Sequence, residues 1–346
     1  MATYDVVVVG GGPAGCAVAA RLADARPTWR IALIETGRSK GNFLVSMPMG
    51  IVAMLPKAGP YNYGYQTVPQ AQLHGRRGYQ PRGRGIGGSS LINAMIYIRG
   101  QKEDYDDWAA AGCSGWGWRD VLPYFKRAED NTRGESALHG VGGPLHVDDL
   151  RNESKATDAF LAAAQEAGHR LTHDFNGPDQ EGVGKYQVFQ KNGYRYNAGQ
   201  AYIHAVHRSN LHVLADTQAL RIVFEGDRAI GVCVRDRSGE RLIRAANEVI
   251  VSGGAFGSPQ LLMLSGIGPG QHLRDHGIAV VADRPAVGEN LQDHLDHISS
   301  RVARTPGSVG LSLSGAVPIL GGLLPFLRHG RGPLTSNAAE AGGFVR

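Results

Sequence analysis

The sequence has 346 residues, which is enough for one large domain or two of ordinary size. A hydrophobic fraction of 42% and a charged fraction of 19% exclude an intrinsically disordered chain. The net charge of +5 comes from scattered arginines without a lysine-rich tail, so we predict no nucleic-acid partner. Glycine is the unusual residue: its 49 positions are about twice the ordinary share and predict many tight turns and close backbone approaches.

Cysteine use and apolar segments bear on the cellular compartment. Cys16, Cys113 and Cys233 are far apart and odd in number, which excludes a disulfide framework and favours a reducing compartment. The N-terminus lacks the long apolar core of a signal peptide. Glycines and prolines interrupt the apolar stretch Ala316–Leu327, which is shorter than the roughly 20 residues of a membrane span. We therefore predict a cytoplasmic protein with no membrane span.

The chain opens with a predicted β-α-β unit. Tyr4–Val9 is β-branched and almost continuously apolar, as in a strand buried on both faces of a parallel sheet. Glycines end this strand, and Pro13 favours a helix start, so we expect a helix from there to about Ala25. Ile31–Glu35 is the expected second strand. This order is typical of an α/β fold.

The middle of the chain is less regular. Residues 41–88 carry no periodic pattern, and we expect a long irregular excursion that covers a ligand. Ala156–Ala167 has the pattern of an amphipathic helix. Nearby tryptophans are expected in the core, because no basic stripe accompanies them as it would for nucleic-acid stacking. These are Trp108, Trp116 and Trp118.

A second run of predicted strands follows residue 210. The turns Gly226-Asp227 and Ser238-Gly239 predict a small antiparallel meander between two sheet strands. We expect the next helix to cover Ser258–Leu264, because Ser258-Pro259 suits a helix start. The predicted strands are Leu211–Leu214, Leu220–Glu225, Ala229–Asp236, Glu240–Arg244 and Glu248–Val251.

The first glycine-rich loop has the spacing of a dinucleotide-binding fingerprint. Gly10, Gly12 and Gly15 form G-x-G-x-x-G between a predicted strand and a predicted helix. Gly10 permits the sharp turn, Gly12 lets pyrophosphate approach the backbone, and Gly15 lets helix and strand pack closely. The helix N-terminus at Pro13 supplies free N–H donors. Glu35 can accept hydrogen bonds from ribose hydroxyls and would repel a 2′-phosphate.

This loop predicts a bound dinucleotide but does not decide between FAD and NAD. The alternative is a strand–helix turn whose glycines serve packing alone. A second glycine-rich segment, Arg82–Gly100, offers backbone donors, hydroxyls and flanking arginines, which suit a polyanionic ligand. Arg84 and Gly88 are the residues that we expect to contact it. The alternative here is an arginine- and glycine-rich surface turn.

Four segments, in family order, resemble the glucose–methanol–choline (GMC) oxidoreductases. The Gly10–Gly15 loop is the first. Gly87–Gly100 (GGSSLINAMIYIRG) resembles one family signature, and Gly254–Gly268 resembles a second. Val287–His294 is similar to the family's VG.NLQDH element. Together the segments cover residues 4 to 294.

The resemblance implies an α/β fold with a Rossmann-like FAD-binding sheet domain and a second, α+β substrate domain that is incomplete. Residues 1–38 and 200–296 would form the FAD-binding domain, and residues 39–100 a segment that covers FAD. Residues 101–199 and 297–346 would belong to the substrate domain.

The resemblance also implies which residues contact the cofactor. Ile92 stands where some members carry a histidine that attaches FAD covalently, so we expect non-covalent FAD. Gly10, Gly12, Pro13, Gly15 and Glu35 would hold the ADP half, while Ser89, Asn93 and Ala94 line the pyrophosphate–flavin end, Ala219 contacts adenine through its backbone, and Gly254 and Ala255 lie near the cofactor.

The implied activity is oxidation of an alcohol by hydride transfer to FAD, with the electron acceptor and the oligomeric state left open. The resemblance places the catalytic histidine pair, or histidine and asparagine, beyond residue 346. No catalytic residue is therefore assigned, and we expect residues 1–346 alone to be inactive. Glu340 is expected near the substrate pocket, with a salt-bridged surface glutamate as the alternative.

Two other functions stay open. One is a hydroxynitrile-lyase-type enzyme on the same scaffold, and the other is a non-catalytic FAD-binding protein, should the chain end naturally at residue 346. A metal site is not predicted, because the pairs His272/His276 and His294/His297 have no third ligand at convincing spacing.

Overall fold

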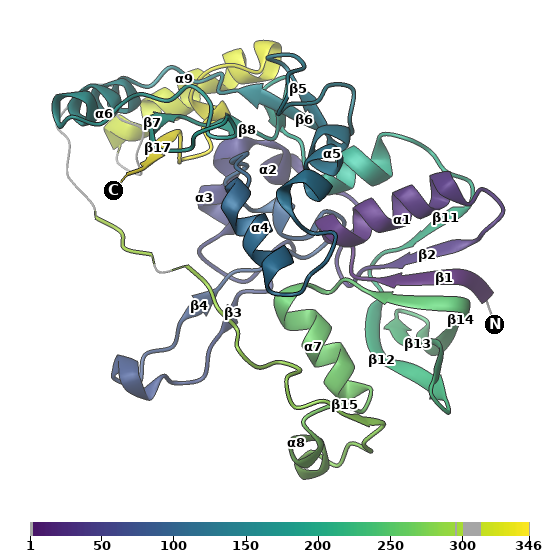
Figure 1. Ribbon diagram of the computed structural model, residues 1–346. Helices are drawn as coiled ribbons and strands as arrows, with labels where there is room; N and C mark the ends of the chain where they lie inside the picture. The colour runs from purple at the N-terminus through teal and green to yellow at the C-terminus, as the bar shows by residue number, and fades with distance from the viewer. Residues whose placement is uncertain (1–2, 295, 300–312, 346) are drawn as a thin grey trace. The chain divides into compact units, whose positions relative to one another are not determined.

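The computed structural model describes residues 3–294, 296–299 and 313–345 (Figure 1). The chain divides into two compact units. The first unit comprises residues 1–41, 55–92 and 198–301, and the second comprises residues 42–54, 93–197 and 302–346. The segment 39–100, expected from the sequence to cover the cofactor, contributes to both units.

A six-stranded sheet organises the first unit, in the order β11-β2-β1-β14-β13-β12. The first four strands of that order pair in parallel, and the last three pair antiparallel. The parallel part follows the strand order of a Rossmann-like domain, which confirms the predicted α/β class. The strands are β1 (Thr3–Val9), β2 (Ile31–Ile34), β11 (Leu211–Leu214), β12 (Gln218–Glu225), β13 (Arg228–Asp236) and β14 (Gly239–Val251).

Strand β14 joins the two parts of the sheet. Its first half, residues 239–244, pairs antiparallel with β13, and residues 244–251 pair in parallel with β1. The prediction of two strands, Glu240–Arg244 and Glu248–Val251, is therefore wrong. One strand changes partner where the sequence pattern breaks. The predicted antiparallel meander is present, and it continues the same sheet.

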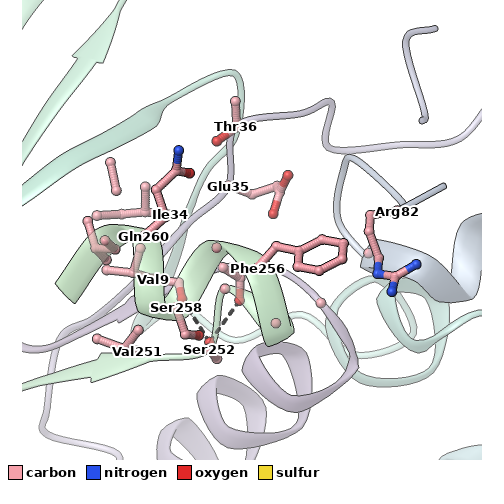
Figure 2. Close-up of a pocket in the computed structure, with 18 of the residues that line it drawn as sticks. Val9, Ile34, Glu35, Thr36, Arg82, Val251, Ser252, Phe256, Ser258 and Gln260 are labelled. Atoms are coloured by element: carbon pink, nitrogen blue, oxygen red, sulfur yellow. Dashed lines mark hydrogen bonds between the residues drawn. The ribbon is translucent and has the colours of Figure 1, made fainter. Parts of the chain in front are cut away.

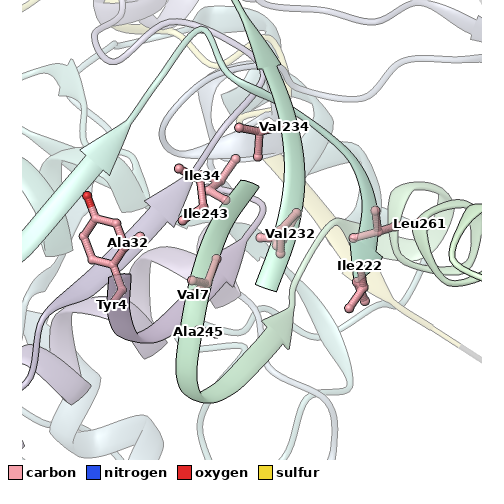
Figure 3. Close-up of a cluster of buried hydrophobic side chains, with 11 residues drawn as sticks. Tyr4, Val7, Ala32, Ile34, Ile222, Val232, Val234, Ile243, Ala245 and Leu261 are labelled. Carbon is pink, nitrogen blue, oxygen red and sulfur yellow. The ribbon is translucent and has the colours of Figure 1, made fainter. Parts of the chain in front are cut away.

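Helix α1 (Pro13–Ala25) has the predicted bounds and lies against β1, β2 and β11 (Figure 1). Its buried face consists of small residues, including Cys16, Ala19 and Ala20, which allow a close approach to the sheet. Strands β12, β13 and β14 and Leu261 of helix α7 (Gly254–Leu264) form an apolar cluster with β1 and β2 (Figure 3). Val7 and Ala32 are among its fully buried members.

Helix α7 begins earlier than the sequence suggests. Its N-cap is Gly253, so Pro259 lies inside the helix and not in its first turn. The expected start at Ser258 is wrong, because the helix begins four residues earlier and accommodates Pro259, which removes one backbone hydrogen bond. The remaining elements of this unit are β3 (Tyr65–Gln66), the 3-10 turns Ala71–Leu73 and Gly88–Leu91, β4 (Tyr79–Gln80), a π-helix over Gly199–His204, β15 (Ile267–Gly268), α8 (Gly270–Asp275) and β16 (Ala282–Asp283).

Short strands and separate helices make up the second unit. Helix α6 matches the predicted amphipathic helix within one residue at each end. The elements are α2 (Phe43–Ser46), a 3-10 turn (Pro48–Gly50), α3 (Ile51–Met54), α4 (Lys102–Ala110), α5 (Trp118–Ala128), β5 (Glu129–Asn131), β6 (Leu145–Asp149), α6 (Lys155–Glu166), β7 (Gly182–Lys185), β8 (Gln187–Val188), β9 (Gln190–Lys191), β10 (Tyr194–Arg195), α9 (Leu313–His329), a 3-10 turn (Pro333–Thr335) and β17 (Ala341–Phe344).

Two of the three tryptophans expected in the core of the second unit are exposed. Trp108 is 50% exposed and Trp116 is 56% exposed, so the core assignment is wrong for these two. Trp118 is half-buried and packs on Tyr105 and Phe125. The Trp108 ring contacts both the Trp116 ring and the ring of the buried Tyr105, and aromatic packing stabilises such a cluster without full burial of each ring. None of the helices in the described parts of the chain is both long enough and apolar enough to cross a membrane.

Candidate functional site

A cavity of about 560 Å³ opens in the first unit where three parallel strands end (Figure 2). Val9, Ile34 and Val251, the last residues of β1, β2 and β14, all line it. The carboxyl ends of parallel strands, beside a helix N-terminus, are where α/β folds bind nucleotides. The other walls come from residues 82–83, 88–89, 217–220 and the first turns of α7.

The three glycines of the first loop differ in whether the surrounding structure requires glycine at their position. Gly10 has a φ of +104°, and a Cβ there would overlap the carbonyl oxygen of Ser252. A Cβ on Gly15 would overlap the carbonyl oxygen of Gly10, which accounts for the close packing of helix and strand. A Cβ on Gly12 would meet nothing within 4 Å, although Gly12 lines the cavity. The protein's own packing therefore does not require glycine at Gly12, whereas a ligand on the backbone would.

Glu35 lies at the end of β2 with its carboxylate buried against backbone amides. One carboxylate oxygen accepts from the N–H of Gly37 at 2.8 Å and of Gly85 at 3.0 Å, and the other accepts from Gly11 at 2.9 Å. Burial raises the pKa of the Glu35 carboxyl, and these three N–H groups act in the opposite direction. Glu35 also lines the cavity, so its remaining lone pair is available to a ligand hydroxyl.

The second glycine-rich segment packs directly on the first loop. Gly88 has a φ of +53°, and a Cβ there would lie 2.6 Å from the Cα of Gly12. Gly88 and Ser89 line the cavity, and the Ser89 hydroxyl accepts from the N–H of Gly83 at 3.0 Å. Arg84 is not among the residues that line the cavity; its guanidinium lies over the ring of Tyr63, 5.6 Å from the centroid.

Three of the remaining predicted contacts also lie on the cavity wall. Ala219 does so from strand β12, and Gly254 and Ala255 from the first turn of α7. Arg82 lines the cavity as well, and the sequence reasoning missed it in favour of Arg84. The arginines alternate along the segment, and only the packing of Gly83 shows which of them lines the cavity.

Comparison with known proteins settles the family. The sequence model of the GMC oxidoreductases matches residues 4–296. The chain belongs to the GMC oxidoreductase family.

Relatives of this GMC chain include dehydrogenases of alcohols. It is 43% identical to the alcohol dehydrogenase [acceptor] of Pseudomonas putida over 99% of this chain and 62% of that protein. It is 44% identical to the oxygen-dependent choline dehydrogenase of Rhizobium johnstonii over 88% of this chain and 55% of that protein. The chain thus spans roughly three fifths of the length of the curated relatives that it matches.

Solved structures share the fold of this GMC chain. An FAD-dependent oxidoreductase from Chaetomium thermophilum superimposes with a TM-score of 0.84 at 28% identity, over 98% of this chain and 61% of that one. FAD is therefore the cofactor that the family implies. The cavity residues fit its ADP half: Gly12 leaves open space for phosphate, Glu35 faces the cavity, and the N-terminus of α1 adjoins both.

Two predicted cofactor residues of the GMC signature belong to the second unit. The side-chain oxygen of Asn93 accepts from the N–H of Met95 at 3.2 Å and from Nη1 of Arg195 at 2.9 Å. The carbonyl oxygen of Ala94 accepts from the amide of Asn337 at 2.8 Å. Their contacts to a cofactor stay a prediction.

The predicted substrate residue Glu340 is tied to its own unit. Its carboxylate accepts hydrogen bonds from the side chains of Asn152, at 2.5 Å, and Thr157, at 2.7 Å. These bonds join the segment before β17 to the start of helix α6. A role toward substrate stays a prediction.

The histidine pair on α8 has no ligand set around it. The rings of His272 and His276 contact each other, with centroids 4.6 Å apart. Within the described ranges, no group of three histidine, cysteine or acidic residues could hold a metal ion.

Proposed function

We propose that the protein oxidises a CH–OH group of a small alcohol, using FAD held without a covalent bond. The observation that carries the proposal is the cavity at the ends of β1, β2 and β14, with glycine backbone on one side and Glu35 on another. Family membership and the names of the relatives, alcohol and choline dehydrogenases, support alcohols as the substrate class.

When bound, FAD supplies a hydride acceptor for the alcohol carbon. The described residues of the first unit bind and orient it. Gly12 and the N-terminus of α1 receive the phosphates through backbone N–H groups, and Glu35 accepts from a ribose hydroxyl. We assign the base that takes the hydroxyl proton to none of the described residues.

The residue at position 92 supports non-covalent attachment. This residue is aliphatic and 2% exposed, so it offers no nucleophile to the flavin. A cytoplasmic location is also proposed, because Cys16, Cys113 and Cys233 are all unpaired.

The test is alcohol-dependent reduction of an artificial electron acceptor by the protein as its gene encodes it. We expect primary alcohols and choline to reduce the acceptor dye, and omission of alcohol to abolish the reaction. Parallel assays with oxygen as acceptor, followed by peroxide formation, distinguish an oxidase from a dehydrogenase. A flavin-containing protein that reduces no acceptor but cleaves hydroxynitriles would replace this proposal with the lyase.

A further inference from the structure

The cavity offers few charged side chains to a bound dinucleotide. A dinucleotide carries negative charge on both phosphates, and backbone N–H groups supply only partial positive charge. Among the described residues that line the cavity, Glu35 is the one acidic side chain and Arg82 the one cationic side chain. Any side-chain cation that balances a bound diphosphate from this wall must therefore be Arg82.

Close contacts between glycines hold the backbone of Arg82 near the Gly10–Gly15 loop. Gly88 lies against Gly12, so closely that a Cβ would come within 2.6 Å of the Gly12 Cα. Gly83 in turn packs on Gly88, where a Cβ would overlap the carbonyl group. Arg82 directly precedes Gly83. Two successive close contacts thus connect the backbone of Arg82 to the loop at the start of α1.

The side chain of Arg82 is held by contacts that exchange easily. Its guanidinium lies over the ring of Phe256, 4.5 Å from the centroid (Figure 2). It also donates to the carbonyl oxygen of Pro81 at 2.7 Å and lies 3.5 Å from the Asp293 carboxylate. The Arg82 side chain is 33% exposed and that of Asp293 is 64% exposed, and such solvated ion pairs contribute little stability. Tyr65 packs edge-on against Phe256, with centroids 5.8 Å apart, and keeps that ring in place. An anion in the cavity can therefore draw the guanidinium from Asp293 at small cost.

We propose that Arg82 is a cofactor-positioning residue that binds the diphosphate of the dinucleotide, with Phe256 as its platform and Asp293 as its competing partner. This inference rests on the proposed function, because it takes FAD as the ligand. A planar guanidinium suits bidentate contacts to phosphate oxygens. Arg84 lies over Tyr63 and has no place on the cavity wall.

The experiment separates diphosphate from nucleoside recognition. The flavin-free form of the protein encoded by the gene is titrated calorimetrically with ADP and with adenosine. Arg82→Gln should weaken ADP binding about ten- to a hundredfold and leave adenosine binding unchanged, since loss of a charge-assisted bond has effects of this size. Arg82→Lys should lie between the wild type and Arg82→Gln. Arg76→Gln, an exposed arginine that does not line the cavity, is the matched control and should bind ADP as the wild type does.

The competing carboxylate gives an independent prediction. Asp293→Asn should tighten ADP binding by up to about fivefold, and this gain should vanish when Arg82→Gln is also present. Wild-type ADP affinity in Arg82→Gln would overturn the proposal, and so would an equal loss of adenosine affinity, which would show a structural role. Failure of the wild-type protein to bind ADP and FAD would instead refute the proposed cofactor itself.

Discussion

Gly12 and Gly15 differ in what an added methyl group would meet, and this difference separates binding from folding. Gly12→Ala meets nothing within 4 Å, so we expect unchanged thermal stability but about ten- to a hundredfold weaker FAD binding. Gly15→Ala would overlap the Gly10 carbonyl, and we expect a loss of about 1–3 kcal/mol in the free energy of unfolding. Gly59→Ala, which also meets nothing, is the control. Thermal unfolding and flavin content per protein are the measurements, and full flavin affinity in Gly12→Ala would contradict the phosphate site.

Glu35 serves the fold as well as the ligand. In Glu35→Gln the side chain has one oxygen and an NH₂ group, so a donor faces the N–H of Gly11 or the N–H groups of Gly37 and Gly85. We expect this variant to lose about 1–3 kcal/mol of stability along with flavin, and Glu35→Ala to lose more. Denaturant unfolding checks the first effect, with the exposed Glu248→Gln as control. A Glu35→Gln protein with wild-type stability would show that these hydrogen bonds do not matter.

Residue-level predictions succeed where one local pattern determines the environment. The spacing of Gly10, Gly12 and Gly15 needs only a strand followed by a helix, and both are present. The partners of Glu35 include Gly85, fifty positions along the chain, and no local pattern reveals that contact. The choice between Arg82 and Arg84 also depends on tertiary packing, that of Gly83 on Gly88 and of Gly88 on Gly12.

A buried network at the start of β5 links elements of the second unit and makes their stability pH-dependent. His139 Nδ1 lies 2.8 Å from the Glu129 carboxylate, and its Nε2 lies 2.9 Å from that of Asp174. Arg99 contacts the other oxygen of Glu129 at 2.6 Å. Hydrogen bonds to Asp174 and Glu129 raise the pKa of His139 from 6.5 to about 9. The imidazolium is therefore the favoured form at neutral pH.

Because the folded pKa of His139 is raised, its contribution is complete below pH 6.5 and is lost as the pH rises through about 9. We expect the free energy of unfolding to fall by about 1–3 kcal/mol over that interval, and to fall less in His139→Gln. Denaturant unfolding between pH 6 and pH 10 measures this. His207→Gln, an exposed histidine, should behave as the wild type. If His139→Gln shows the same pH dependence as the wild type, the His139 network does not cause it.

Elements are predictable where one pattern matches one environment. Helix α1 and strand β11 have the predicted bounds, because each is a continuous segment with a single kind of partner. Strand β14 has an antiparallel partner and then a parallel one, so its pattern changes midway and suggests two strands. Helix α7 has no distinct apolar face that would mark its bounds, and its proline falsely indicates the start. Trp116 shows that an aromatic residue alone does not specify burial.

At the scale of the whole molecule, the sequence predicts the α/β class, and its first glycine loop lines the cavity at the strand ends. A β-α-β unit with a glycine loop suffices for both. The sequence does not predict that residues 39–100 divide between the two units. That segment has little regular structure, so its place depends on tertiary contacts that leave no periodicity. The roles of the two units in binding cofactor and substrate stay a proposal.

The central claim is that the cavity of the first unit holds FAD without a covalent bond. The most direct test is to purify the protein as its gene encodes it, precipitate it with acid, and identify the flavin in the supernatant by chromatography. We expect FAD, not FMN, in the supernatant and colourless protein in the pellet. Flavin retained by the pellet would contradict non-covalent attachment, and a protein without any flavin would contradict the cofactor itself.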